Sequence, residues 1–414
     1  MAKDLKKFVN ARFVRTIDLG LMRRLLDRHA GALRGLDLSL LGREPEPARQ
    51  MLLEFFAGPE DGYPNDLLID LHAIAELGTA NGQQLLLEQA RRQHIPVQPA
   101  NDNDGERQAL QEPKQFALHM FLNHPGVFTA ASDMLSYTTL SSPSEFDGVE
   151  EGVEAHLDDE ARGNFKRAAE ELCEVELRGR HCHVSWYEDG DEVLVVAKHG
   201  AQLRTTEVIE GADDRVITYR EAERAVLSYS SLTGRLKVGG FPKARRAELA
   251  EIFSRTILKR AGFFAAPDAQ NLYTLAPVER RGFGFVFEHA FDPGIRRVQI
   301  TEVQADRVGT DPRSGQTRAL WSHVIRDGKE NALARMRDDA PGISLGPDWR
   351  LNHLTLRVHF DVGDARPVTV TVKIKPPRTA MFKRHRFEDR IMNLLCRNGL
   401  INDRALGGTA AAAV

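Results

Sequence analysis

Cysteines, long hydrophobic runs and signal-like segments are scarce in this chain of 414 residues. Its three cysteines, Cys173, Cys182 and Cys396, cannot form a disulfide framework, which favours a reducing, cytoplasmic setting. No run of eighteen apolar residues occurs, so we expect no membrane-spanning helix. The basic residues 1–7 are not followed by an apolar stretch, so we expect no secretory signal.

Motifs that would identify an enzyme are also missing. No Gly-x-Ser-x-Gly nucleophile elbow occurs, and the Gly-x-Gly at 282–284 lacks the strand-then-helix context of a dinucleotide-binding loop. His181 and His183 flank Cys182 on an expected strand, but no further zinc ligands follow at familiar spacing. We therefore expect no metal or cofactor and favour a non-enzymatic role. A hydrolase or nuclease of unrecognised type stays an alternative, with unknown catalytic residues.

Turn-forming and polar segments divide the sequence into six parts, and at this length we expect several domains. Because most strands are joined by short turns instead of helices, we predict an α+β fold with mainly antiparallel sheet. The parts are a helical domain (1–95), a linker (96–113), a helical segment with an acidic helix (114–180), a β-rich region (181–345), a C-terminal hairpin and helix (346–406) and a disordered tail (407–414).

Hydrophobic periodicity gives the expected elements. The N-terminal part begins with a short strand at 8–17 and continues as leucine-rich helices, most of whose leucines we expect in a core. We expect the remaining surface of these helices to dock a protein partner. Farther along we expect a loop at 141–148, a long acidic helix at 156–177, a helix at 244–260, and strands at 272–275, 283–288 and 298–303.

The net charge of −3 hides a strong segregation of charge. Residues 145–176 hold twelve acidic and three basic side chains, whereas residues 373–404 hold nine basic and three acidic ones. Residues 235–260 are also basic, with eight basic and two acidic side chains. Segregated charge creates a local potential even when the total is small. The plainer alternative is that these charge runs are solvated helix faces, and that the acidic and basic segments simply face each other.

The C-terminal hairpin carries the clearest pattern. Residues 351–361 alternate strictly, with apolar side chains at 354, 356, 358 and 360, and residues 368–375 alternate again. Such a period indicates two half-buried strands, and the Gly-Asp turn between them predicts an antiparallel hairpin. The expected solvent face holds His353, Thr355, Arg357, His359, Lys373 and Lys375, with Asp361 as its only acid.

A helix with an apolar stripe (Phe387, Ile391, Leu394 and Leu395) follows the hairpin, and we expect the two to form one continuous basic surface. A second basic group lies where a strand ends and a helix begins, a setting that favours anions. The candidate phosphate-contacting residues are Arg357, His359, Lys373, Lys375, Arg378, Lys383, Arg384 and Arg386, with Lys243, Arg245 and Arg246 in the second group.

These observations favour a non-catalytic component of a larger assembly that binds the nucleic-acid backbone. Lys and Arg on a strand face suit phosphate oxygens, whereas no base-reading element, such as strand aromatics or a wing, is present. We expect nucleic acid and a protein partner on the N-terminal helices, and no membrane. The alternative from another class is a protein–protein scaffold or regulatory subunit, whose basic surface meets an acidic partner.

Overall fold

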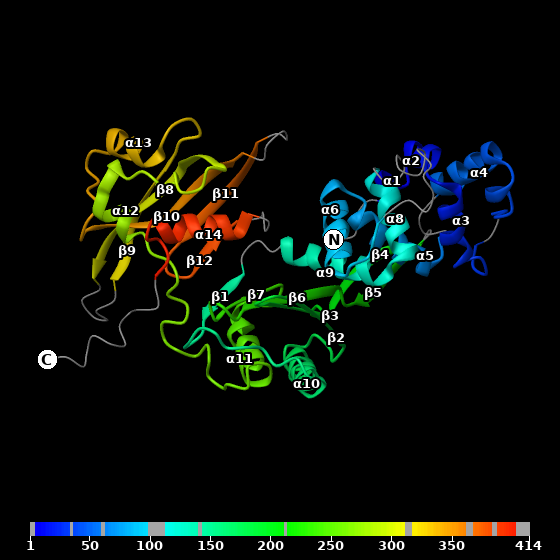
Figure 1. The fold of residues 1–414 in the computed structure, drawn as a ribbon, viewed down its shortest axis with the longest axis horizontal. Helices are drawn as coiled ribbons and strands as arrows, with labels where there is room; N and C mark the ends of the chain where they lie inside the picture. The colour runs from blue at the N-terminus through cyan, green and yellow to red at the C-terminus, as the bar shows by residue number, and fades with distance from the viewer. Residues whose placement is uncertain are drawn as a thin grey trace. The chain divides into compact units, whose positions relative to one another are not determined.

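The structure is a computed structural model of the whole chain, shown in Figure 1. It describes residues 5–33, 36–58, 63–97, 112–139, 143–210, 213–310, 317–361, 367–382 and 387–402. Lys383, Arg384 and Arg386, the expected tail at 407–414, most of the expected linker and the turn of the C-terminal hairpin lie outside the described residues.

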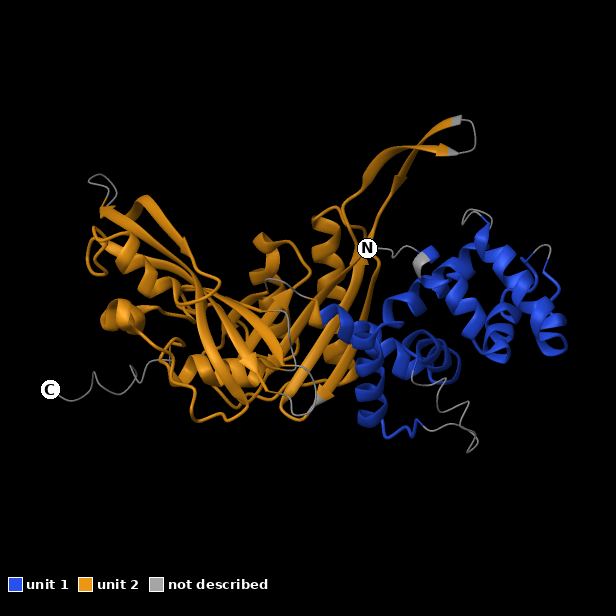
Figure 2. Ribbon diagram, turned by 90° about the horizontal axis from the view of Figure 1, so that it is seen from above, with its two compact units in different colours: residues 1–137 blue, residues 138–414 orange. Residues whose placement is uncertain are grey.

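The chain divides into two compact units, Met1–Tyr137 and Thr138–Val414, coloured separately in Figure 2. Unit 1 is helical in its described part. Its helices are α1 (Leu5–Phe8), α2 (Ala11–Thr16), α3 (Leu19–Asp27), η1 (Leu40–Gly42), α4 (Pro45–Ala57), α5 (Asn65–Leu77), α6 (Ala80–Arg92), α8 (Pro113–Asn123) and α9 (Pro125–Thr138). The finer division into six parts stays a prediction.

The strand expected at 8–17 is instead helical. The side chain of Asn10 accepts a hydrogen bond from the Phe13 amide at 3.0 Å and caps α2. Phe13 and Ile17 are both buried, four residues apart, which is helical spacing. The run of β-formers misled the prediction because the cap and this spacing outweigh strand propensity.

The leucine-rich helices of unit 1 bury their apolar residues in their own core. Leu52, Leu67, Leu71 and Leu86 are almost fully buried. Among the described residues of this unit, Ile69 is the one large hydrophobic side chain that is well exposed, at 58%. The expected core is therefore present, and a partner-docking surface would have little apolar area to offer.

Unit 2 begins with an antiparallel five-stranded sheet, here called the central sheet. Its order is β1-β7-β6-β3-β2. The strands are β1 (Ser144–Asp147), β2 (Cys182–Asp189), β3 (Glu192–Gly200), β6 (Ala222–Ser230) and β7 (Arg235–Gly239). Helices α10 (Asp159–Val175) and α11 (Arg246–Thr256) pack on it around Phe165, Leu227 and Phe253 (Figure 1). Strands β4 (Arg204–Glu210) and β5 (Asp213–Tyr219) form a separate two-stranded ribbon that extends from the unit (Figure 2).

The loop expected at 141–148 contains β1. Four of its residues pair with β7, from Ser144 opposite Val238 to Asp147 opposite Arg235. A partner almost a hundred residues downstream supplies the backbone hydrogen bonds, so the local serine and glycine content misled the prediction.

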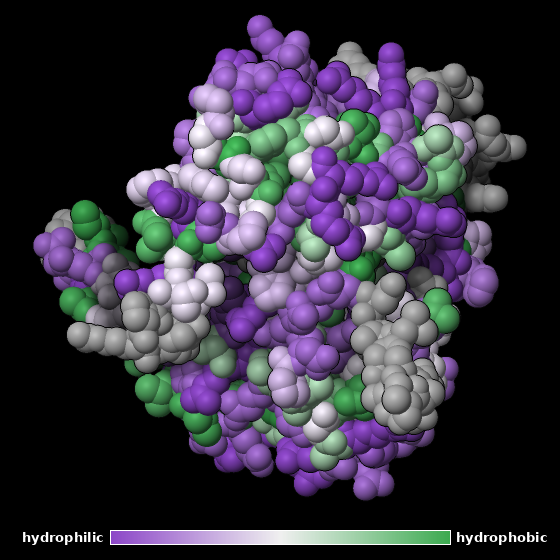
Figure 3. All heavy atoms as spheres, turned by 90° about the vertical axis from the view of Figure 1, so that its left-hand side faces the viewer, coloured by the Kyte–Doolittle hydropathy of each residue, from purple (hydrophilic) through white to green (hydrophobic). Residues whose placement is uncertain are grey.

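The rest of unit 2 is built on a second antiparallel sheet, here called the C-terminal sheet. Its order is β12-β11-β10-β8-β9. The strands are β8 (Ile295–Thr310), β9 (Thr317–Arg326), β10 (Trp349–Phe360), β11 (Val368–Lys375) and β12 (Thr379–Met381), with helices α12 (Ala276–Arg281), α13 (Ala332–Asp339) and α14 (Glu388–Arg397) and the short η4 (Gly282–Gly284). On the side of the molecule at the left of Figure 1, hydrophilic residues dominate and hydrophobic ones form smaller patches (Figure 3).

Two expected strands of this region do not form. Residues 272–275 are irregular apart from one isolated bridge between Tyr273 and Ile401, and residues 283–288 begin in η4. Their apolar side chains still enter the core, because Leu272, Phe285 and Phe287 are buried beneath the sheet. The apolar pattern of these two segments therefore predicted the burial of their side chains correctly, but it predicted strand pairing wrongly.

The predicted hairpin is confirmed as β10 paired with β11, from Leu354 opposite Ile374 to Phe360 opposite Val368. Its apolar face packs against α14, where Phe360 and Phe387 stack with ring centres 4.3 Å apart. Because side chains alternate along a strand, Arg357 and His359 point to the other side of the sheet. The hairpin's polar side chains and α14 therefore lie on opposite faces, and do not form one continuous surface.

A buried polar contact joins the central sheet to the C-terminal part of unit 2. Lys237 on β7 forms an ion pair with Glu388 in the first turn of α14. The Tyr273 hydroxyl donates to Glu145 on β1 at 2.6 Å, and Glu145 is only 4% exposed. Burial raises the pKa of Glu145 and of Tyr273, and it lowers the pKa of Lys237.

Helical unit 1 and the three sheets described in unit 2, with antiparallel neighbours throughout the described strands, confirm the predicted α+β class. Within the described ranges no helix is both long and apolar enough to span a bilayer.

Candidate nucleic-acid interface

The polar face of the C-terminal sheet collects most of the expected hairpin residues. We define it by Arg297, Gln299 and Glu302 on β8, Thr355, Arg357 and His359 on β10, and Thr369, Thr371, Lys373 and Lys375 on β11. The register sets Thr369, His359 and Arg297 side by side in one row. The next row holds Thr371, Arg357 and Gln299. Positive groups are thus spread over three adjacent strands.

Three basic side chains of the polar face have no acidic partner in the described part of the chain. Among the described residues, no carboxylate lies within 4.0 Å of Arg297, Arg357 or Lys375, and all three are exposed. Arg297 donates to the backbone carbonyl of Lys329 at 3.3 Å instead. Lys375 lies two residues beyond Lys373, which pairs with Thr355, and Thr355 is four residues along β10 from the row of Arg297. The three basic side chains therefore span roughly 20 Å at about 3.3 Å per residue.

His359 lies among these charges. Its Nδ1 is 3.1 Å from the Thr369 hydroxyl, and its Nε2 has no hydrogen-bond partner among the described residues although that atom is buried. Burial lowers the pKa of His359, and Arg297 and Arg357 lower it further. The imidazole is therefore held neutral, and an anion on this face would favour its protonated form.

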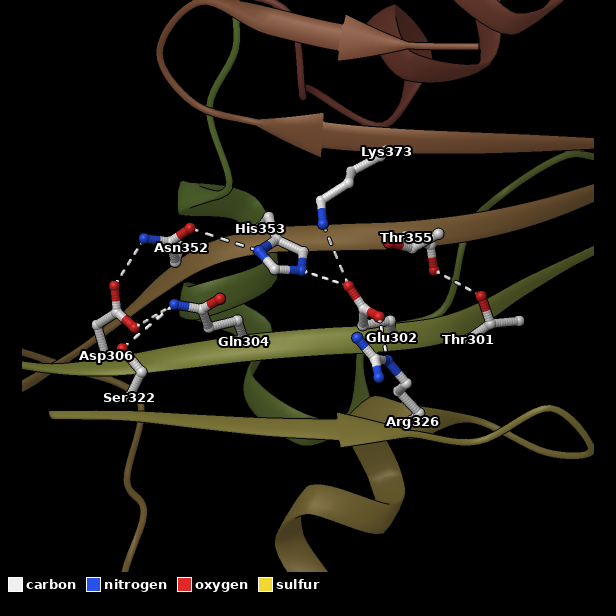
Figure 4. Close-up of polar contacts among 10 residues, drawn as sticks. All are labelled: Thr301, Glu302, Gln304, Asp306, Ser322, Arg326, Asn352, His353, Thr355 and Lys373. Carbon is white, nitrogen blue, oxygen red and sulfur yellow. Dashed lines mark hydrogen bonds and ion pairs between the residues drawn. The ribbon is translucent and has the colours of Figure 1, made fainter. Parts of the chain in front are cut away.

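Glu302 compensates the charge at the other end of the polar face, as Figure 4 shows. One carboxylate oxygen is 2.6 Å from His353 Nε2 and 3.3 Å from Lys373 Nζ, and the other is 2.5 Å from Arg326 Nε. The Arg326 hydrogen bond in particular, with those of His353 and Lys373, lowers the pKa of Glu302 to about 2. Lys373 is therefore paired, whereas Lys375 on the same strand face is not.

His353 is buried instead of solvent-exposed, which corrects the prediction for that position. Its exposed fraction is 6%, because β8 pairs with β10 and places Glu302 beside it. Burial lowers the pKa of His353. Next to it Asn352 donates to Asp306 at 2.7 Å, and Gln304 bridges Asp306 and Ser322 (Figure 4). The positive potential is therefore concentrated toward the Arg297 end.

The remaining expected site residues lie elsewhere. Arg378 is exposed in the turn between β11 and β12. Lys243, Arg245 and Arg246 lie in η3 (Lys243–Arg245) and at the start of α11, beside the central sheet. Arg245 pairs with Glu176 at 2.7 Å and Glu248 at 3.0 Å.

Arg246 makes a structural hydrogen bond to the backbone. Its Nε donates to the Phe241 carbonyl at 2.8 Å, and burial lowers its pKa. Of this second basic group, Lys243 is the exposed member with no ion pair to a described residue. The group is therefore much weaker as an anion site than its sequence indicates.

The acidic segment 145–176 does not pair with the hairpin in the described part of the chain. Three of its ion pairs, Asp147 with Arg235, Glu150 with Arg260 and Glu176 with Arg245, have partners from the basic segment 235–260. Two more are local, and join Glu170 to Lys166 and Glu174 to Arg180. The plainer explanation of the charge segregation thus holds for the basic segment 235–260, whereas among the described residues the acidic segment does not compensate the hairpin's charges.

The histidine and cysteine candidates form no centre. His181 and His183 are exposed, and Cys182 and Cys173 are buried in the core of the central sheet. Burial raises the pKa of Cys173 to about 11 and that of Cys182 to about 12, so both thiols stay protonated and unreactive. No group of three or more metal-ligating side chains gathers anywhere in the described ranges.

Arg297, Gln299 and Glu302 are the residues of this face that sequence reasoning did not place there. All three belong to β8, which lies about fifty residues before the strand that it pairs with. The strand expected at 298–303 was the available signal, but nothing local assigns it to β10. No protein-family model matches this chain, and no curated protein is significantly similar to it.

Proposed function

We propose that this protein binds the phosphate backbone of nucleic acid, without catalysis, through the polar face of the C-terminal sheet. The carrying observation is the set of three exposed basic side chains, Arg297, Arg357 and Lys375, that have no carboxylate partner among the described residues. Guanidinium and ammonium groups are the usual donors to phosphate oxygens, and such contacts carry affinity without sequence information.

The neighbouring groups support this role. The hydroxyls of Thr369 and Thr371 accompany the basic residues on the same strand face and can donate to phosphate oxygens. Burial, with Arg297 and Arg357, lowers the pKa of His359 and keeps it neutral in the free protein, and a bound anion would favour its protonated form. The span of roughly 20 Å corresponds to about six base pairs at 3.4 Å each.

The helix does not take part in this proposal. Arg390 on α14 is bound by Asp292, with Nε and Nη2 2.8 and 2.7 Å from its two oxygens, and lies over the Phe360 ring on the apolar side of the sheet. The proposed interface is thus smaller than the hairpin-and-helix surface expected from the sequence.

A triple variant tests the proposal. We expect Arg297→Gln, Arg357→Gln and Lys375→Gln together to weaken binding of a fluorescent duplex at 50 mM salt by at least about tenfold, because counterion release at each site is lost. The control is Arg337→Gln, an exposed arginine on α13 paired with Asp338. Equal affinities of the triple variant and the wild type would contradict the proposal.

Protein binding is the second candidate, and β9 favours it. This strand forms one edge of the C-terminal sheet and leaves Leu320, Trp321 and Val324 about half exposed. Exposed edges with apolar side chains can pair with a strand of another chain. A protein that co-purifies after nuclease treatment and is lost with Trp321→Ser would support protein binding through β9. Equal recovery of that protein with the wild type and the variant would argue against it.

A further inference from the structure

A pocket lined by three arginines lies away from the polar face, at the ends of two helices. Arg280 and Arg281 come from the last turn of α12, and Arg397 comes from the last turn of α14. Asn398 and Glu288 also line the pocket, whose volume is about 280 Å³. Both helices contribute to the core on the apolar side of the C-terminal sheet, so this site is separate from the proposed interface.

All three arginines line this one pocket without an acidic partner among the described residues. No carboxylate of a described residue lies within 4.0 Å of Arg280, Arg281 or Arg397, although Glu288 lines the same pocket. Like charges brought together repel one another, and a helix end needs one cation at most to complement its dipole. Capping of two helix ends therefore does not explain three arginines around one pocket.

Two of the three arginines lie over aromatic rings. The guanidinium carbon of Arg281 is 5.8 Å from the centre of the Phe285 ring, and that of Arg397 is 5.7 Å from the Phe291 ring. Stacking of this kind limits the conformations of a long side chain and leaves its edge N–H groups free to donate.

The backbone around the pocket is also fixed. Asn398 donates to the Glu288 carbonyl and accepts from the Glu288 amide, both at 2.9 Å. Gly399 follows with a positive φ of 69°, and a Cβ there would meet Pro277 Cγ at 3.3 Å. The close approach of the two segments thus depends on glycine, and the pocket is formed before any ligand arrives.

We propose that this arginine pocket binds a phosphoryl group. Arginine forms bidentate hydrogen bonds to phosphate, and three guanidinium groups complement a dianion better than a monoanionic carboxylate. The volume is slightly below the range of about 300–1,000 Å³ that is typical for drug-sized ligands, so it favours inorganic phosphate or the terminal phosphate of a larger molecule.

Calorimetric titration of the full chain with inorganic phosphate, at ionic strength matched with chloride, tests this assignment. We expect saturable binding at one site, weakened at least about tenfold by Arg280→Gln, Arg281→Gln or Arg397→Gln. Arg397→Lys keeps the charge but loses the planar fork, so it should give an intermediate loss and guards against a variant that fails to fold. Arg337→Gln on α13 is the charge-matched control and should bind as the wild type does.

Absence of saturable phosphate binding to the wild-type chain, or equal binding by all arginine variants, would overturn the proposal and leave the arginines as helix-end charges. A 5′-phosphorylated oligonucleotide that competes with phosphate, when its unphosphorylated form does not, would identify a nucleic-acid end as the source. Competition by small phosphomonoesters alone would identify a metabolite. Phosphate binding that is lost in Lys375→Gln and kept in the arginine variants would place the anion on the polar face and overturn the assignment to this pocket.

Discussion

Two lysines on the same strand give the sharpest test of the polar face. Lys373 and Lys375 lie on one face of β11, two residues apart, but Lys373 is 3.3 Å from Glu302 whereas Lys375 has no carboxylate partner among the described residues. Only an uncompensated lysine is expected to displace counterions from a phosphate. Lys375→Gln should therefore weaken nucleic-acid binding, and Lys373→Gln should change it much less.

The expected salt dependence follows from Arg297, Arg357 and Lys375, the three basic side chains without a carboxylate partner among the described residues. With three phosphate contacts, log K should fall against log salt with a slope of about −2.7 for duplex DNA or about −2.1 for a single strand. Between 50 and 200 mM salt that is a loss of about fortyfold in duplex affinity. Removal of Lys375 should reduce the slope to about −1.8 and the loss to about twelvefold.

Fluorescence anisotropy across that salt range measures both slopes. Both substitutions remove one positive charge at neighbouring positions, so the general electrostatic change is matched. Arg326 and His353 still contact Glu302 when Lys373 is removed, which keeps that carboxylate compensated. Equal slopes for the two variants, or a larger change for Lys373→Gln, would refute the reasoning that the ion pair with Glu302 distinguishes Lys373 from Lys375.

Three further predictions concern the charged groups of unit 2. Because Arg326 and its other partners lower the pKa of Glu302 to about 2, its ionised form stabilises the fold above pH 4.5 and less as pH falls toward 2. Arg326 is 77% exposed, so solvent screens its charge and limits the effect. Glu302→Gln should therefore lower the free energy of unfolding in urea by about 1–2 kcal/mol at pH 7 and by near zero at pH 2. A difference that does not depend on pH would contradict this. The pKa of His359 is lowered in the free protein and should rise on binding, so affinity should increase from pH 7.5 to 5.5 in the wild type but not in His359→Gln. Tyr273→Phe removes the donor to buried Glu145 and should lower the urea midpoint by the equivalent of about 1–3 kcal/mol at unchanged slope; an unchanged midpoint would show that this contact contributes nothing.

Local pattern was sufficient to predict the hairpin and the terminal helix. Alternation placed Leu354, Leu356 and Val358 in the core, where they are fully buried, and helical spacing did the same for Ile391 and Leu394. In both cases one element has a single apolar side, so its period determines what is buried. The α+β class followed from the same local evidence, because short turns join most strands.

The pairing between distant segments could not be predicted. Glu302 contacts His353 and Lys373 because β8 lies beside β10, and the sequence contains no local signal for that neighbour. β1 likewise depends on β7 for its backbone partners. The arginine pocket depends on a contact between Glu288 and Asn398, which are 110 residues apart. Charge composition therefore indicated which residues are basic, but not which of them are neutralised.

The position of the phosphate on the protein is tested most directly by the His359 imidazole. Its resonance can be assigned by its loss in His359→Gln and followed by NMR titration against pH, with and without a saturating short duplex. Binding across the polar face predicts that the His359 pKa rises in the complex, because the negative charge of a phosphate offsets that of Arg297 and Arg357 and favours the protonated imidazole. A His359 pKa that is the same in the free and saturated protein would contradict nucleic-acid binding at this face.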